Sequence, residues 1–408
     1  MARPAAALWG AVVFMPVGVN YGAFILLWLA FLVGGDWRER AQRVRHHPLW
    51  WPVVFYMAWT LLVLAFGKHY PQTPGNTLHG LRIAATVLAA LALTRDETVW
   101  ALRAFLAMAV AGLVLIGLHA LIGFPPFPPF DALLELVGNK SISNALLLTI
   151  VATGAALLGF EALHGPHRWR AVIAFGVVAA VLAVISQTLP SRTSMLGFLL
   201  AMVLAGLHRW RRELRSFALA LLLGGAVIGV AVWQSPTVQQ RFEKGVQEIE
   251  AAQAGAVSEG SWVVRFYMYR DTALMMADRP IFGWGIGGWT EQWHLRGPKL
   301  LADYNMPHND FLWMGSQAGV PGAFSLLLIM IVGLRQAWRR QDLTGRFAFA
   351  AMVVLTVGTS LNSALRDAQI GLSLLWVAML YLRCVQEPGE PWRNVLTLSG
   401  RAPRLHRP

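Results

Sequence analysis

The chain has 408 residues, of which 56% are hydrophobic and 13% are charged. An average soluble protein has about a quarter of its residues charged, so this composition excludes an ordinary soluble domain. The formal net charge is +13. However, the arginines occupy short connections between apolar segments, which argues against nucleic-acid binding and is typical of a polytopic membrane protein.

Apolar segments recur along the whole chain, and a hydrocarbon core of about 30 Å needs about 20 apolar residues in a helix. We predict membrane spans at about 5–17, 20–34, 49–66, 80–94, 100–123, 143–161, 170–188, 194–207, 216–233, 309–334, 347–362 and 369–383. The first two could form one long span, although the turn residues from Pro16 to Asn20 favour a hairpin. The predicted fold class is therefore all-α, a polytopic membrane protein with about twelve transmembrane helices.

Arginine-rich connections fall on one side of the membrane if the predicted spans alternate in direction. These connections contain Arg38, Arg40, Arg43 and Arg45; Arg168 and Arg170; Arg209, Arg211, Arg212 and Arg215; Arg335, Arg339, Arg340 and Arg346; and the tail beyond Arg383. Basic residues in short loops remain in the cytoplasm during insertion, so this side is predicted to be cytoplasmic.

The opposite, outward side then carries one large loop at 234–307, in which we predict helices at 236–253 and at about 262–277. The expected organisation is an N-terminal transmembrane bundle at 1–233, the loop at 234–307, C-terminal transmembrane helices at 308–385 and a cytoplasmic tail at 386–408. We expect the ionisable residues to avoid the spans almost completely.

His308 lies where the large outward loop meets the next predicted span. Pro307 favours a helix start, which would place His308 in the first helical turn. The positive end of the helix would keep the imidazole neutral at pH 7 and able to accept a proton. The alternative is an interfacial histidine bonded to the backbone. Asn309 could cap the helix or bind a sugar hydroxyl, and Gly319 and Gly322 would allow close helix packing.

Two outward arginines are candidates for binding phosphate. Arg192 lies in a short turn at 189–193, where it could grip a phosphate with two nitrogens or anchor the chain to lipid headgroups. Arg265 lies early in the second predicted loop helix, with Tyr269 four residues later on the same face. Its alternative role is that of a solvated surface charge.

Further polar and aromatic residues on the outward side are weaker candidates. Arg366 and Asp367 could neutralise each other, or Asp367 could orient His308 or receive a hydroxyl hydrogen. The tryptophans of the loop could stack on sugar rings, or they could simply anchor it at the membrane interface. These tryptophans are Trp284, Trp289 and Trp293.

Metal-binding patterns are missing from the outward segments. They contain no Asp-x-Asp, no Cys/His cluster and no His-x-x-x-His pattern. We therefore expect neither a dedicated metal site nor another cofactor.

The chain resembles the O-antigen ligase/polymerase superfamily of bacterial envelope glycosyltransferases. The resemblance rests on His308-Asn309 followed by Gly319 and Gly322 after a large loop, on the Arg265 helix that leads into the Pro280–Gly287 segment, and on Arg192 in a short upstream turn. The predicted span pattern agrees with that superfamily over almost the whole chain, and the motifs distinguish its members poorly.

The resemblance implies a GT-C-like glycosyltransferase in the bacterial inner membrane, with its loop in the periplasm. In the ligase branch, a glycan passes from undecaprenyl pyrophosphate to the lipid A–core oligosaccharide in lipopolysaccharide biosynthesis, with inversion and without a metal. By position, His308 would be the catalytic residue, and Arg192 and Arg265 would contact the pyrophosphate. Asp367 would be a weaker candidate for an acidic residue common in similar proteins.

Alternative functions remain open from the sequence. An O-antigen polymerase or a protein O-oligosaccharyltransferase of the same superfamily would use the same donor with a different acceptor. A lipid or glycan transporter belongs to a different class. Transporters usually place ionisable residues within their spans, which we do not expect here.

Overall fold

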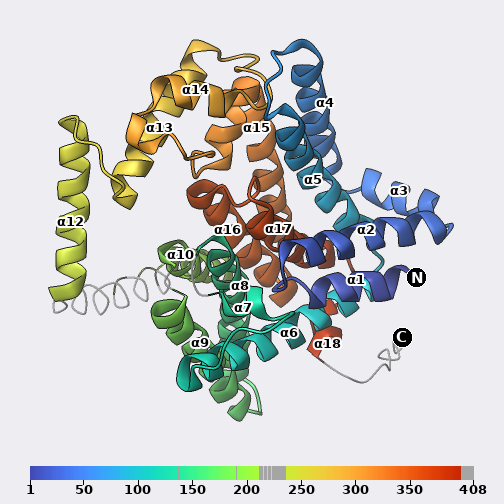
Figure 1. Ribbon diagram of the computed structural model, residues 1–408. Coiled ribbons are helices and arrows are strands. Elements are labelled where there is room, and N and C mark those ends of the chain that lie inside the picture. Colours follow the sequence, from blue (N-terminus) through green and yellow to red (C-terminus); the bar gives the residue numbers. More distant parts are fainter. Residues whose placement is uncertain are drawn as a thin grey trace.

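The computed structural model describes residues 1–135, 138–189, 191–210 and 236–396, together with the single positions 215, 218 and 222. Within these residues every regular element is a helix and there is no strand (Figure 1). Apart from positions 218 and 222, the predicted span at 216–233 lies outside the described residues. Arg211, Arg212 and the tail from 397 onward also lie outside them.

The elements follow one another along the chain as labelled in Figure 1. The N-terminal part contains α1 (Ala2–Ala11), α2 (Val17–Val33), α3 (Trp37–Arg45), α4 (Trp50–Phe66), α5 (Thr73–Ala92), α6 (Arg95–Ile122), α7 (Asp131–Leu134), α8 (Gly138–Leu163), α9 (Trp169–Ala183) with a π-helical end (Val184–Thr188), and α10 (Arg192–Arg209). The remainder contains α12 (Pro236–Gln253), α13 (Ser261–Asp278), α14 (Gly288–Arg296), a 3₁₀ turn (Lys299–Leu301), α15 (Asp310–Arg339), α16 (Leu343–Asn362), α17 (Ala368–Cys384) and α18 (Pro391–Leu396).

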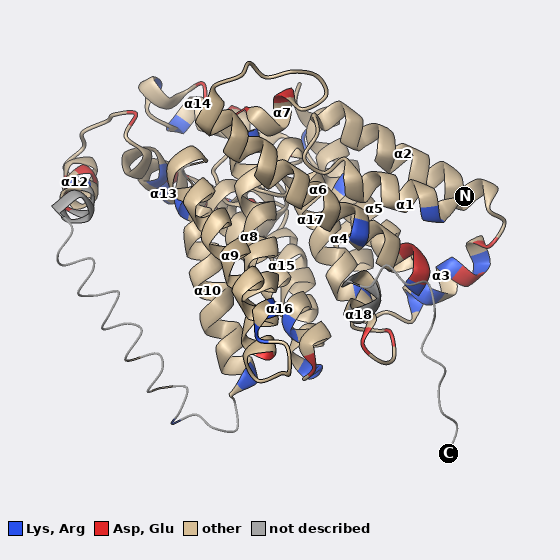
Figure 2. Ribbon diagram, turned by 90° about the horizontal axis from the view of Figure 1, so that it is seen from below, with Lys and Arg blue, Asp and Glu red and all other residues tan. Residues whose placement is uncertain are grey.

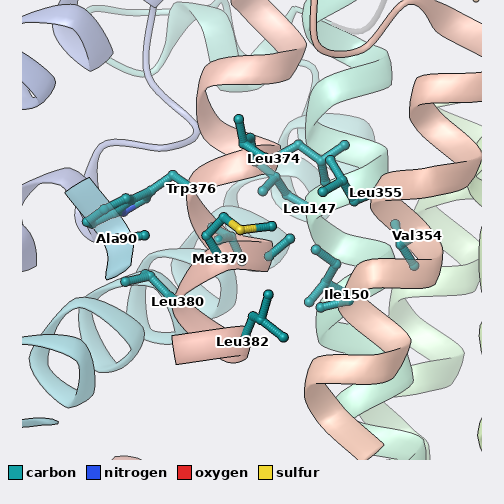
Figure 3. Close-up of a cluster of buried hydrophobic side chains, with 14 of the residues drawn as sticks. Ala90, Leu147, Ile150, Val354, Leu355, Leu374, Trp376, Met379, Leu380 and Leu382 are labelled. Carbon is teal, nitrogen blue, oxygen red and sulfur yellow. The ribbon is translucent and has the colours of Figure 1, made fainter. Parts of the chain in front are cut away.

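Helices α16 and α17 form the centre of the bundle. They pack against each other and against α8, while α16 also contacts α10 and α15, and α17 also contacts α5. Figure 3 shows side chains from α5, α8, α16 and α17 interleaved in this core. Trp376 of α17 stacks on Trp9 with 3.9 Å between ring centroids, which brings α1 onto the same core.

One end of the bundle gathers the arginine-rich connections, and we call it the arginine-rich end. Polar contacts join helix ends there: Arg346 with Glu161, Arg383 with the carbonyl of Leu93, Arg40 with Glu97, and His208 with the carbonyl of Trp338. Figure 2 shows Lys and Arg at the foot of α10, α15 and α16 and around α3. The prediction that these connections share one side is confirmed for the described residues.

The helices vary in their ability to cross a membrane. Among the described residues, α6, α8, α9 with its π-helical end, α15 and α16 are long and apolar enough, which makes five candidates. A sixth exists if α2 and α3, bent by 112°, count as one broken span, and α4 and α17 are apolar but shorter. The chain is a polytopic helical membrane protein, but the predicted number of about twelve spans is not confirmed.

The first 34 residues form two helices, as the turn residues favoured. α1 ends at Ala11, and α2 begins at Val17 after Pro16. With 10 residues, α1 is about 15 Å long, half the thickness of a hydrocarbon core. The predicted span at 5–17 is therefore a short helix. It lies directly against α6, because a Cβ atom on Gly10 would come within 2.1 Å of the carbonyl oxygen of Ala101.

The helices of the large loop begin and end close to the predicted residues. α12 covers Pro236–Gln253, and α13 covers Ser261–Asp278, against predictions of 236–253 and about 262–277. This region has its own small core, formed by Ala252, Val263, Val264, Tyr267, Met268, Met275, Trp289, Trp293 and Leu301. α13 and α14 also contact α15, so the loop packs on the helix that follows it.

α15 is broken in its first half, and the break receives the segment between α13 and α14. Gly319 has φ 70°, a conformation that glycine adopts most easily. A Cβ atom at Gly319 would lie 2.1 Å from the carbonyl oxygen of Ile281. The backbone bonds across the break run from Trp284 N to Ser316 O, from Gly285 N to Gln317 O and from Val320 N to Pro280 O, at 2.8, 3.0 and 2.7 Å.

Gly319 and Gly322 therefore have different roles. Gly319 allows the break and the approach of the loop backbone, whereas the sequence suggested only close packing between helices. Gly322 is close-packed within the helix, since a Cβ atom there would lie 2.5 Å from Cβ of Ala318.

Candidate functional site

The start of α15 defines the position of the candidate histidine. Asn309 is the N-cap, and its Oδ1 accepts hydrogen bonds from the backbone N–H groups of Phe311 and Leu312 at 2.9 and 3.0 Å. The helix proper begins at Asp310, so His308 precedes it with φ 52°. The prediction that His308 lies in the first helical turn is therefore wrong by two positions, because Asn309 caps the helix.

The His308 ring lies half-buried and neutral. Burial, followed by the positive charge of Arg265, lowers its pKa from 6.5 to about 4. The predicted neutrality at pH 7 is confirmed, although its causes are burial and Arg265 rather than the helix end. Tyr304 stands edge-on to the ring, with 6.1 Å between centroids. Within the described part of the chain, no hydrogen bond occupies either ring nitrogen.

Arg265 and Tyr269 approach His308 from one face of α13. Tyr269 Oη donates to the backbone carbonyls of His308 and Ser360, both at 3.3 Å. Burial raises the pKa of the Tyr269 phenol, so it remains a donor at pH 7. Arg265 is half-buried, and its charge acts on both the Tyr269 phenol and the His308 ring. Its one side-chain hydrogen bond in the described residues goes from Nη1 to the carbonyl of Ser261 at 3.3 Å.

Arg192 lies farther along the same end of the bundle. It is the first residue of α10, after the N-cap Ser191, and its side chain is exposed. No hydrogen bond or ion pair engages it among the described residues.

The packing of α10 against α16 shows where Arg192 lies along the length of the bundle. Gly197 faces Val354 and Val357, and the His208 ring stacks on Phe349, so the two helices are antiparallel. Five residues before Gly197 correspond to about 7.5 Å along a helix. The start of α10 is therefore level with the end of α16, whose Ser360 carbonyl binds Tyr269.

Asp367 is engaged in capping and does not approach His308 in the way considered from the sequence. Its Oδ1 accepts from the backbone N–H of Gln369 at 2.7 Å and so caps α17. Its Oδ2 accepts from Nδ2 of Asn139. No ion pair joins Asp367 to Arg366 within the described residues, so mutual neutralisation by direct contact is also not observed.

The tryptophans of the loop are largely occupied within it. Trp289 and Trp293 are buried, stack on each other at 5.4 Å, and donate to Thr272 and to the carbonyl of Leu301. They present no face to a sugar, so that interpretation is wrong for both.

Trp284 is half-buried at the edge of the same segment. Its Nε1 donates to the carbonyl of Met275, and the guanidinium carbons of Arg279 and Arg296 lie 4.1 and 4.7 Å from its ring centroid. The ring therefore already has two cationic partners.

Asp310 and Arg82 are polar residues that the sequence analysis missed. Asp310 is fully buried, and its carboxylate accepts from the backbone N–H groups of Leu365 and Arg366 at 2.7 and 2.9 Å. Arg82 is buried in α5 and donates from Nη2 to the carbonyls of the same two residues. Arg82 lies inside a predicted span, at 80–94, and an ionisable residue there is itself a signal of a specific role.

Metal-ligating side chains do not cluster in the described residues. No group of three or more His, Cys, Asp or Glu side chains lies close enough there to hold an ion. The charged group that acts on the His308 ring is instead the guanidinium of Arg265.

Comparison with known families locates the same region. Residues 188–327 match the family model described as O-antigen ligase, which covers about a third of the chain. The matched residues include Arg192, Arg265 and His308. No curated protein matches the chain.

Proposed function

The chain belongs to the O-antigen ligase/polymerase superfamily, and we propose that it is an O-antigen ligase. Its donor is an O-antigen glycan linked to undecaprenyl pyrophosphate, and its acceptor is the lipid A–core oligosaccharide. The reaction takes place at the periplasmic face of the inner membrane, among membrane lipids.

One observation carries this proposal: the half-buried His308 ring, whose nitrogens have no hydrogen bond among the described residues, is kept neutral by burial and by the positive charge of Arg265. The pair stands at the end of the bundle opposite the arginine-rich end, because α15 runs from Asp310 to Arg339 between them. A proton acceptor next to a fixed positive charge suits transfer from a phosphate leaving group.

The proposed reaction is a single displacement. The oxygen of an acceptor hydroxyl attacks the anomeric carbon, the bond from that carbon to the pyrophosphate oxygen breaks, and undecaprenyl pyrophosphate leaves. His308 accepts the hydroxyl proton, a role that typically contributes about 10²–10⁴-fold to the rate. Attack opposite the leaving group inverts the anomeric configuration.

The leaving pyrophosphate gains negative charge as the bond breaks. Arg265 and Arg192 neutralise this charge in the proposed mechanism, which gives the step a metal-independent route. A guanidinium binds phosphate oxygens through two parallel N–H groups and remains charged at any physiological pH. Arg192 is exposed and unpaired in the described structure, so it is available for such a contact.

Asn309 and Tyr269 act on His308 through the backbone. Asn309 caps the start of α15 directly after the histidine, and Tyr269 donates to the carbonyls of His308 and of Ser360 near the end of α16. We assign both to positioning the histidine. Asp367 and Trp284 remain weaker candidates for contact with the sugars.

The proposal is tested with purified full-length protein and both lipid substrates. We expect transfer that is insensitive to a chelator, and its loss in Arg192→Ala, Arg265→Ala and His308→Ala. Arg270→Ala is the matched control, because Arg270 lies on the same helix as Arg265 but is exposed and paired with Asp271. Wild-type activity in any of the three variants would remove that residue from the mechanism.

The acceptor is tested in a deletion strain by the ladder of its lipopolysaccharide. Loss of every rung with accumulation of lipid-linked polymer is the result expected for a ligase. A product with a single rung would instead indicate a polymerase. No transfer by the purified protein with any acceptor would favour the transporter alternative.

A further inference from the structure

Arg366 is a half-buried arginine with unused hydrogen-bonding capacity. It lies in the turn between α16 and α17, next to the start of α15. Its Nε is buried and has no hydrogen-bond partner. Its one side-chain hydrogen bond among the described residues runs from Nη1 to Oδ1 of Asn305 at 3.3 Å, and no carboxylate there lies within ion-pair distance.

The backbone of Arg366 is fixed from two directions. On one side, the buried carboxylate of Asp310 accepts its N–H and that of Leu365. On the other side, the buried guanidinium of Arg82 binds the carbonyls of the same two residues. Two consecutive peptide groups are therefore held by a carboxylate from α15 and a guanidinium from α5.

Arg82 is itself held in place by other side chains. Its Nη1 donates to the hydroxyl of Tyr21 at 2.9 Å and lies 3.2 Å from Nδ1 of His79. The charges of both Arg82 and Arg366 act on the His79 ring. This network fixes the turn without using any atom of the Arg366 guanidinium.

The electrostatic surroundings of Arg366 combine burial with two carboxylates and a second guanidinium. Burial lowers the pKa of its guanidinium, Asp367 and Asp310 oppose that shift, and Arg82 adds to it. The two carboxylates already accept hydrogen bonds elsewhere, Asp367 from Gln369 and Asp310 from the backbone of the turn. The buried Nε of Arg366 therefore has no acceptor among the described residues, so an anion arriving there would find an unused donor.

Arg366 also borders the segment that carries the candidate histidine. Asn305, its side-chain partner, precedes His308 by three residues, and Asp310, its backbone partner, follows His308 by two. Arg265 acts on the same segment through the His308 ring. Two arginines from separate parts of the chain therefore flank one short stretch of backbone.

We propose that Arg366 is a further anion-binding residue of this site, which takes a phosphate group of one of the lipid substrates. Asp310 and Arg82 are the positioning residues that hold it. The substrate part of this inference rests on the proposed transferase function. The shared chemistry is a phosphate oxygen, which comes either from the donor pyrophosphate or from a phosphate on the acceptor lipid.

Direct binding tests the inference without any need for turnover. Inorganic pyrophosphate is titrated into the purified full-length protein by calorimetry, with the wild type compared with Arg366→Gln, Arg366→Lys and the control Arg270→Gln. Loss of a charged hydrogen-bond donor should weaken binding at least about tenfold in Arg366→Gln. Arg366→Lys should lose less, and Arg270→Gln should bind as the wild type does.

Equal affinity of wild type and Arg366→Gln, or no binding by the wild type, would overturn the inference. Thermal unfolding and size-exclusion profiles establish that each variant is folded. If Arg366→Gln does not fold, Arg366→Lys carries the comparison, because it keeps the charge but loses the two-pronged geometry. Unchanged affinity in that variant would also count against the inference.

Initial rates then identify the source of the phosphate. A raised KM for the donor at saturating acceptor points to the pyrophosphate, and a raised KM for the acceptor at saturating donor points to the acceptor phosphate. If KM is unchanged for both, Arg366 does not contact either substrate. If the wild type shows no transfer but Arg366→Gln still weakens pyrophosphate binding, the ligase proposal fails and the anion site stands.

Discussion

Among single residues, His308 combines a rare backbone conformation with an imidazole whose pKa is lowered. A non-glycine residue with φ 52° is strained, and such strain costs about 1–3 kcal/mol. Asn309 on one side and Tyr269 on the other hold the residue in this conformation. The backbone that carries the imidazole is therefore fixed, and the ring is in the neutral form that accepts a proton.

The pH dependence of transfer follows from the lowered pKa of His308. A base with a pKa of about 4 is deprotonated at every higher pH. We expect kcat/KM to stay flat from pH 8 to below the usual histidine value of about 6.5 and to fall only as the pH approaches 4. Initial rates across this range measure the profile. A fall in kcat/KM near pH 6.5 in the wild type would contradict the assignment of His308, with its lowered pKa, as the base.

Substitution of Arg265 should shift this profile. The positive charge of Arg265 disfavours the imidazolium, so Arg265→Gln should raise the pKa of His308, though not to its usual value, because burial remains. The residual activity should then fall at a higher pH than in the wild type. Arg265→Lys keeps the charge and is the matched control. Its activity should fall at nearly the same pH as that of the wild type.

Asn309 offers a third residue-level prediction, which separates capping from sugar binding. Asn309→Ala should lower the free energy of unfolding by about 1 kcal/mol, because two backbone N–H groups lose their acceptor. Asn309→Ser keeps a capping oxygen and should retain both stability and transfer. Thermal unfolding and transfer assays measure the two effects. A stable but inactive Asn309→Ser would show that the amide contacts substrate.

The sequence predicted local features of this site better than distant ones. The capping role of Asn309 depends only on its own side chain and the three residues that follow it. The Arg265–Tyr269 pair depends only on the spacing of four residues in a helix. Asp310 bonds to residues 55 and 56 positions away, and Arg82 bonds to residues more than 280 positions away. No spacing in the chain indicates such partners, so these contacts required the fold.

At the scale of elements, the break in α15 joins the loop to the bundle. We expect Gly319→Ala to destabilise the protein by more than 1 kcal/mol, since the new Cβ would collide with the Ile281 carbonyl and the residue has positive φ. Transfer should fall with it, because the Pro280–Gly287 segment leads from the Arg265 helix. Gly117→Ala is the control, as a Cβ there meets nothing within 4 Å.

Thermal unfolding and initial rates measure both glycine variants. Gly117→Ala should be neutral or slightly stabilising, because alanine favours a helix interior over glycine. A Gly319→Ala protein with wild-type stability and transfer would show that the break in α15 is not required.

Among the elements, the two long helices of the loop were easier to place than the apolar helices of the bundle. Charges and turn residues bracket the helices at 236–253 and 261–278, so their ends were predicted closely. Hydropathy alone does not show where an apolar stretch stops being helical, and α1 ends six residues before the predicted limit of 17. Nor does it reveal a bend such as the one of 112° between α2 and α3.

At the scale of the whole molecule, the distribution of arginines gives a testable orientation. The arginine-rich end should face the cytoplasm, and the end that carries His308 should face the periplasm. Cysteine substitutions at exposed positions report the two sides, Ser258 for the loop and Gln341 for the connection between α15 and α16. The natural Cys384 is buried, so background labelling should be low.

An impermeant maleimide applied to intact spheroplasts should label Ser258→Cys but not Gln341→Cys. Permeabilised cells should allow both to react. Labelling of Gln341→Cys in intact spheroplasts would reverse the orientation and place the proposed site on the wrong face for a periplasmic acceptor.

The separate cores of the bundle and of the loop have a consequence for how the site is assembled. Arg265 belongs to a helix whose apolar face packs in the core of the loop, whereas His308 opens a helix that belongs to the core of the bundle. The basicity of the histidine therefore depends on how closely these two bodies dock. If the loop moved away from the bundle, the imidazole would become exposed to water and more distant from Arg265. Its pKa would then rise, and it would be protonated more easily. Docking of the loop on α15 would then control the basicity of the histidine.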